Sequence, residues 1–99
     1  MFRHVVMWNY KEGFTAEENK ANALKVKDSL EGLKGVIPEI VDIKVYINDF
    51  DSSTKDIMLD SVFADEAAFL VYRDNDDHKK AGAITKDVLD NRVAFDYYE

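Results

Sequence analysis

The alternation of apolar and polar residues changes period along this 99-residue chain in an order that few folds accommodate. Residues 2–8 alternate between two faces, as a β-strand does, and residues 40–47, 56–63 and 92–98 repeat that period of two. Between the first and second segments, and again between the third and fourth, apolar residues recur at helical spacing. The sequence therefore predicts the order strand, helix, strand, strand, helix, strand. In the second strand one face is expected to carry Val41, Ile43, Val45 and Ile47.

The first helix, expected to run to about residue 33, has clear start and stop signals. Thr15 is a good N-cap, and Glu18 three residues later completes a capping box. Gly32 marks its end, and Pro38 prevents the helix from continuing. The core-facing stripe of this helix is expected to consist of Ala16, Ala23, Val26, Leu30 and Leu33.

The second helical region is predicted to be broken in two. A short helix is expected over residues 65–72 and a longer one over residues 78–90, with the acidic turn 74–77 between them. Asn75 or Asp76 would suit the N-cap of the second segment. The inward-facing residues of that segment are expected to be Ala81, Ile84 and Val88.

This order of elements is that of an α+β, ferredoxin-like domain, predicted here as one domain over residues 1–99. Its four strands form an antiparallel sheet with the helices on one face, so the other face is left uncovered. That open face would carry Val5, Met7, Met58 and Val62, and soluble monomers rarely expose such an apolar patch. We therefore expect a homodimer in which two open sheet faces pack together and close an α+β barrel.

Composition excludes several classes of function. The net charge of −7 leaves no basic stripe for nucleic acid and disfavours an anionic membrane surface. The apolar N-terminal segment is too short to span a bilayer and lacks the order of a signal peptide, so a cytoplasmic protein is expected. There is no cysteine, no glycine-rich phosphate loop and no zinc-type histidine spacing, so no cofactor or metal is expected. Asp49, Asp51 and Asp56 could bind Mg²⁺ or Ca²⁺ loosely, but a solvated acidic loop is favoured.

Four segments carry a resemblance to a known family. RHVVMWNYK at residues 3–11 is similar to an opening K/R-H strand that ends in an aromatic residue and a lysine. VIPEI at 36–40 resembles an I-P-x-hydrophobic step into a second strand, and FADEAA at 63–68 resembles an F-x-[DS]-x-x-A helix start. YRDNDDH and DNRVAFDY, within residues 72–97, are similar to a closing Y-x-x-H-P-x-H and D-R-V-x-x-D-[FY] pattern. Together they resemble the stress-responsive A/B barrel (Dabb) family of dimeric ferredoxin-like proteins.

The resemblance implies a small-molecule cavity between the helices and the sheet of each subunit. Some family members cyclise polyketides by aldol condensation, with a histidine and a tyrosine at the positions matched by His78 and Tyr72. The chain departs from that cyclase pattern at Asn75, Asp76 and Ile57, which replace histidine, proline and histidine. A small apolar or phenolic ligand would lie against Val6, Trp8, Leu24, Leu59, Phe69 and Ile84, although Leu24 lies beyond the edge of the stripe on the first helix.

The chemistry depends on whether Tyr72 and His78 face each other. Six residues on an unbroken helix place two side chains about 240° apart, but the predicted break removes that objection. His78 would then act as a general base, because its ordinary pKa lies near ~6.5. Tyr72 would donate a hydrogen bond to a carbonyl or enolate oxygen, and His4 would orient His78 or bind a polar substituent.

A non-catalytic protein is the alternative. His78 would then be a solvated neighbour of a helix cap, Tyr72 a core residue and His4 a hydrogen-bonded structural residue. The space between the first helix and the sheet separates the two hypotheses. An open, polar-lipped pocket that contains His78, Tyr72 and His4 favours an enzyme, whereas a closed pocket filled by Leu24, Phe69 and Trp8 favours a structural or stress-associated barrel.

Overall fold

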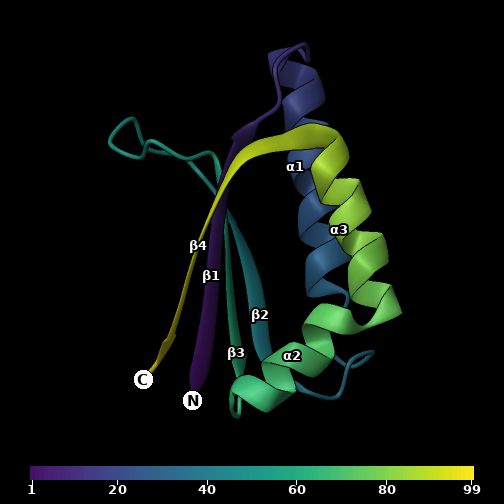
Figure 1. The fold of residues 1–99 in the computed structure, drawn as a ribbon. Helices are drawn as coiled ribbons and strands as arrows, with labels where there is room; N and C mark the ends of the chain where they lie inside the picture. The colour runs from purple at the N-terminus through teal and green to yellow at the C-terminus, as the bar shows by residue number, and fades with distance from the viewer.

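The computed structural model describes all residues 1–99 and contains four strands and three helices. In chain order these elements are β1 (Phe2–Tyr10), α1 (Ala16–Glu31), β2 (Ile40–Ile47), β3 (Ile57–Phe63), α2 (Glu66–Asp74), α3 (Asp76–Val88) and β4 (Leu89–Tyr98). The sheet is antiparallel with the order β2-β3-β1-β4. All three helices lie on one side of it (Figure 1). The predicted ferredoxin-like α+β fold is confirmed, and its second helical region is a pair of helices.

The first helix starts as its sequence predicts. The Thr15 side chain accepts a hydrogen bond from the backbone of Glu18, whose own carboxylate accepts one from the Thr15 backbone, so both halves of the capping box are present. Gly32 is the C-cap, one residue before the predicted end. Leu33 is buried just beyond the helix, whereas Ala16 is exposed because the first turn of α1 extends past the sheet. The buried positions on α1 itself are Ala23, Val26 and Leu30.

A single residue, Asn75, separates α2 from α3. Its backbone is extended, with φ −70° and ψ 137°, and its side chain accepts a hydrogen bond from the backbone of Asp77 at 2.8 Å. Asn75 therefore ends α2 and is also the N-cap of α3. Of the two N-cap candidates, the structure selects Asn75 over Asp76.

A bulge in β4 explains why that strand begins earlier than predicted. The pairing with β1 shifts between Met7 and Asn9, and Asn91 adopts a left-handed backbone with φ 55°. The extra residue places Leu89, before the bulge, on the same sheet face as Ala94 beyond it. Because the bulge interrupts the alternation of faces, residues 89–91 do not show the period of two from which the strand was predicted.

A second irregularity in β2 corrects another expectation. The pairing with β3 shifts between Ile40 and Asp42, so Val41 is turned out of the core and is 45% exposed. Ile40 is buried in its place, and the alternation resumes at Ile43 and Val45. The predicted apolar face of β2 is therefore present from Ile43 onward, and only Val41 departs from it.

The two faces of β1 have different surroundings. Phe2, His4, Val6 and Trp8 are buried beneath the helices, whereas the intervening residues lie on the opposite face and are half-buried. The neighbouring strand β4 adds Phe95, 69% exposed, which pairs directly with Val5. The open face predicted from the sequence is thus present, and it carries Val5, Met7, Met58, Val62, Val93, Phe95 and Tyr97.

Candidate functional site

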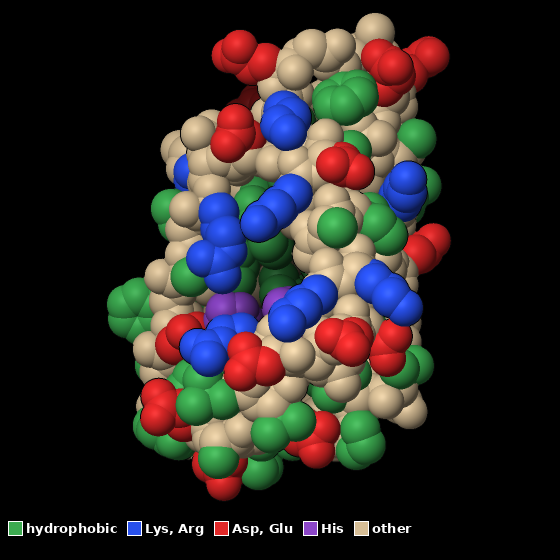
Figure 2. Space-filling model, turned by 45° about the vertical axis from the view of Figure 1, so that its right-hand side comes forward, with side chains coloured by type: hydrophobic (Ala, Val, Ile, Leu, Met, Phe, Trp, Pro, Cys, Tyr) green, Lys and Arg blue, Asp and Glu red, His purple; other side chains and the backbone are tan.

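A cavity of about 170 Å³ lies between the sheet and the helices α1 and α3. Both histidines of the chain line it, and Figure 2 shows their side chains at one end of the hollow with basic side chains around them. Its apolar wall is formed by Val6, Trp8, Leu30 and Leu59, and the rest of its lining by Gly82, Thr85, Lys86 and Arg92. The cavity is open and polar on one side and contains both histidines, but Tyr72 is not part of its lining, so the structure meets the enzyme criterion only in part.

His78 is held in a defined orientation by the break between α2 and α3. It lies in the first turn of α3, and its Nδ1 is 3.0 Å from the carbonyl oxygen of Arg73, in the last turn of α2. Because a carbonyl oxygen only accepts, Nδ1 carries the hydrogen and the neutral ring keeps its lone pair on Nε2. Burial lowers the pKa of His78 and the nearby charge of Arg92 lowers it further, against the bond to Arg73. The neutral form, which can accept a proton, is therefore favoured.

Tyr72 lies under His78. Their ring centroids are 4.2 Å apart, and the Tyr72 ring also packs against Phe63, at 4.9 Å. Tyr72 is completely buried, does not line the cavity, and its hydroxyl has no hydrogen-bond partner. Burial strongly raises its pKa, so the hydroxyl stays protonated. The Tyr72 hydroxyl is thus a buried hydrogen-bond donor without an acceptor.

His4 lines the same cavity from β1. Its Nδ1 hydrogen-bonds the carboxylate of Asp96, which is its cross-strand neighbour on β4, and its ring lies 4.6 Å from that of Phe69. Burial lowers the pKa of His4 although Asp96 opposes that effect. With Nδ1 bonded to the carboxylate, the neutral ring has its lone pair on Nε2, as in His78.

The six residues predicted to line the pocket divide into two groups. Val6, Trp8 and Leu59 do line the cavity. Phe69 is buried against the rings of Phe2 and His4 and does not line the cavity. Leu24 is 56% exposed and Ile84 lines a separate groove between α1 and α3, so neither belongs to the cavity. Leu24 is exposed because it lies beyond the edge of the core-facing stripe of α1. Ile84, expected to face inward, is only half-buried, and its neighbour Thr85 is buried instead.

The polar residues of the site, Asp96, Thr85, Lys86 and Arg92, were not predicted from the sequence. A signal for Asp96 was present. If Val93, Phe95 and Tyr97 face the open side of the sheet, Asp96 must face the helices. No such rule applies to Arg92, because it lies in the bulge.

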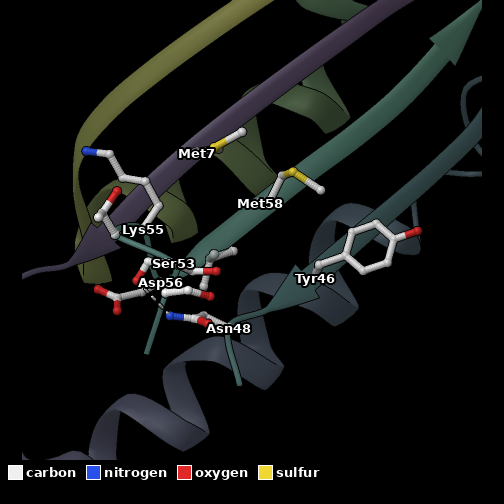
Figure 3. A pocket seen from close by; sticks show the side chains of 10 residues that line it. Met7, Tyr46, Asn48, Ser53, Lys55, Asp56 and Met58 are labelled. Carbon is white, nitrogen blue, oxygen red and sulfur yellow. Dashed lines mark hydrogen bonds between the residues drawn. The ribbon is translucent and has the colours of Figure 1, made fainter. Parts of the chain in front are cut away.

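A second hollow, of about 400 Å³, lies on the open face (Figure 3). Met7, Met58 and Tyr46 cross it as neighbours on three adjacent strands, and the loop after β2 closes one end with Lys55 and Asp56. This hollow contains no histidine. It belongs to the surface predicted to pair with a second copy.

The structure contains neither a cluster of metal ligands nor a membrane-spanning helix. No group of three or more histidine, cysteine, aspartate or glutamate side chains is placed to hold a metal ion. In the acidic loop, Asp56 instead accepts hydrogen bonds from the Tyr10 backbone and the Asn9 amide. None of the three helices has the length and apolar composition needed to cross a bilayer.

Comparisons with known proteins agree with this architecture. A dimeric protein of unknown function with a ferredoxin-like fold from Bacteroides fragilis superimposes with a TM-score of 0.92 at 26% identity, over 99% of this chain and 95% of that one. A Dabb family protein from Mesorhizobium loti has a TM-score of 0.70 at 20% identity, over 99% and 95%. The hydroxynitrile lyase from Passiflora edulis has a TM-score of 0.73 at 16% identity, over 97% and 90%.

No curated protein sequence matches this chain. The profile of the stress responsive A/B barrel domain, however, matches residues 2–99. That match covers the segments whose spacing resembles the family, and it includes both histidines, Tyr72 and Asp96. The chain belongs to the stress responsive A/B barrel (Dabb) family.

Proposed function

We propose that this protein binds a small, partly apolar molecule in the cavity between helices and sheet and removes a proton next to its carbonyl group, with His78 as the base. The observation that carries the proposal is the bond from His78 Nδ1 to the Arg73 carbonyl. It leaves Nε2 as the basic atom of a histidine that lines the cavity and is kept neutral by burial.

In the proposed step, the C–H bond next to the carbonyl breaks and its proton is transferred to Nε2 of His78. The electron pair moves into the new carbon–carbon double bond, and the negative charge develops on the carbonyl oxygen as an enolate. Tyr72 would donate its unpartnered hydroxyl to that oxygen once a ligand reaches it. The enolate then attacks a second carbonyl, as in an aldol cyclisation, or is reprotonated by His78, as in an isomerisation.

The pKa of His78 limits the substrates of such a reaction. A base whose pKa is below its ordinary value near 6.5 is weak, and proton transfer to it is efficient only from an acidified carbon. A carbon between two carbonyl groups meets that condition. We therefore propose β-dicarbonyl compounds, the chemical class of polyketide intermediates, as substrates.

His4 supports this chemistry through Asp96. The carboxylate fixes the ring so that Nε2 of His4 is the second lone pair in the cavity. His4 would hold a hydroxyl or enol group of the ligand in place. Its role is positioning, since the Asp96 carboxylate orients the ring.

The functional unit is proposed to be a homodimer. The open face exposes Phe95, Val93 and Tyr97 in a continuous apolar surface of the kind that monomers rarely carry. The Bacteroides fragilis neighbour, which shares the fold across nearly its whole length, is described as dimeric. A twofold pair of these faces would bury that surface and close the barrel.

One observation favours the non-catalytic alternative, a barrel that binds a ligand without transforming it. Tyr72 is fully buried under His78 and does not reach the cavity surface. In that case its hydroxyl contributes nothing to a reaction. The hydroxynitrile lyase neighbour, at 16% identity, illustrates only that the fold can support an enzyme.

Deuterium exchange separates these possibilities. Exchange at the carbon between the two carbonyls of benzoylacetate, and of its ethyl ester, is followed by proton NMR in D₂O with and without protein. We expect protein-dependent exchange that falls by about 10²-fold or more in His78→Gln. The control is Lys25→Gln, which changes an exposed residue on α1. Equal exchange rates with and without the wild-type protein for both probes would refute catalysis.

A further inference from the structure

The charges around the cavity differ from those of the whole protein. The chain carries 20 acidic residues against 13 Lys and Arg, yet no Asp or Glu lines the cavity, whereas Lys86 and Arg92 do. An adjoining groove shares His78 and Lys86 with the cavity and adds Arg73 and Lys79, again without an acidic residue. The other three hollows each contain both a lysine and an aspartate. The positive lining is therefore specific to the site of the two histidines.

The two cations of the cavity, Arg92 and Lys86, form no ion pair within the chain. Asp96, the carboxylate that contacts His4, is already bonded to that histidine. In addition, the Lys11 ammonium lies 2.9 Å from the Lys86 carbonyl oxygen and brings a third positive charge to this end of α3.

Arg92 acts on the interior of the site. Its charge opposes protonation of both His4 and His78, and it lowers the otherwise raised pKa of Tyr72. Arg92 also lines the cavity together with His4 and His78, so its guanidinium lies within reach of a ligand bound there. Its planar pair of N–H donors matches the two oxygens of a carboxylate.

We propose that the cavity binds a small organic carboxylate, with its charged end on Arg92 and Lys86 at the mouth and its apolar body against Val6, Trp8 and Leu59. The volume of about 170 Å³ is below the roughly 300 Å³ at which pockets for drug-sized ligands begin, so the body is about the size of one ring. This inference rests on the cavity being the ligand site, as proposed above, and is independent of catalysis.

The test uses benzoate and its neutral isostere benzamide. Trp8, the single tryptophan, lines the cavity, so its indole N–H signal reports binding directly. We expect benzoate to bind roughly tenfold more tightly than benzamide at low salt, and its affinity to fall as salt is added. Arg92→Gln should abolish this preference and leave benzamide binding unchanged, whereas Arg92→Lys should retain part of it. Lys25→Gln, which removes one positive charge far from the cavity, should behave as wild type.

The outcomes separate this inference from the proposed function. Equal binding of the two probes, or an unchanged benzoate preference in Arg92→Gln, would overturn the carboxylate site while the cavity remains a ligand site. Binding of neither probe would overturn the carboxylate site and the cavity as a ligand site together. Benzoate selectivity without any deuterium exchange would support the carboxylate site and refute only the catalytic proposal.

Discussion

The ring centroids of Tyr72 and His78 lie 4.2 Å apart, although six residues separate them in the chain. On a continuous helix these side chains would diverge by about 240°. The extended backbone of Asn75 removes that divergence, because it ends α2 and starts α3 in a new direction. The pairing of the two rings thus depends on one capping residue.

Replacing that residue should weaken the site. Asn75→Ala removes the side chain that accepts from the Asp77 backbone, so we expect a loss of about 1 kcal/mol in the free energy of unfolding. Asn75→Asp keeps the cap and is the matched control. Urea unfolding measures the loss, and the His78 ring signals in NMR should broaden or shift only in the alanine variant. Equal stability of the alanine and aspartate variants would refute the capping role.

The two histidines should titrate below their ordinary pKa. Burial lowers both pKa values, and the charge of Arg92 contributes in each case. Arg92→Gln should therefore raise both pKa values, whereas Asp96→Asn should lower that of His4 further, because Asp96 opposes the effect of burial. An NMR titration of the ring protons between pH 4 and 9 measures these shifts. Two titrations unaffected by Arg92→Gln would place its charge away from the cavity.

The same shifts make stability depend on pH. Below about 6.5 the unfolded chain binds protons that the folded histidines resist. The contribution of the two histidines to the free energy of unfolding should therefore be complete above that pH. It should decrease as the pH falls toward the lowered pKa values of the folded state. Replacing both histidines with glutamine should remove this part of the dependence, which urea unfolding at several pH values between 4 and 7 will measure.

Tyr72→Phe should separate stability from function. The variant removes a buried hydroxyl that has no partner, and an unsatisfied buried group of this kind costs about 1–3 kcal/mol. We expect unfolding stability equal to or higher than that of the wild type, together with slower deuterium exchange of benzoylacetate. Tyr10→Phe, at a half-buried tyrosine that lines a different groove, is the control. Unchanged exchange in Tyr72→Phe would exclude its role as a donor.

The homodimer is tested on the open face. Phe95→Asp places a charge opposite Val5, within the apolar surface of the open face, and should shift the protein from dimer to monomer. Phe14→Asp introduces the same change in the turn before α1 and should leave the mass unchanged. Light scattering after size exclusion distinguishes one chain of 11.4 kDa from two. A wild-type protein that elutes as a monomer would refute the dimer directly.

Periodicity predicted the fold well because most elements are regular. The buried face of β1, the capping box at Thr15 and the break near Asn75 each depend on local sequence alone. The bulges at Val41 and Asn91 were missed, since a bulge is defined by pairing with a neighbouring strand that the alternation of one strand does not describe.

The candidate site was predicted in part for the same reason. His4, His78 and Trp8 were expected around one cavity, and the structure places all three in its lining. Leu24 was assigned to the pocket by resemblance, although its position on the helix wheel pointed outward, and the wheel was correct. The positively charged residues at the cavity, Lys86 of α3 and Arg92 of β4, were not predicted because they come together only in the folded chain.

Alternate residues of β1 serve opposite sides of the sheet, with His4 and Val6 at the cavity and Val5 and Met7 on the open face. In a dimer that pairs the open faces, the two cavities lie on the outer surfaces of the barrel, with two sheets about 10 Å apart between them. Occupation of one cavity then leaves the other unaltered. Two ligands should bind per dimer without cooperativity, with a Hill coefficient of about 1.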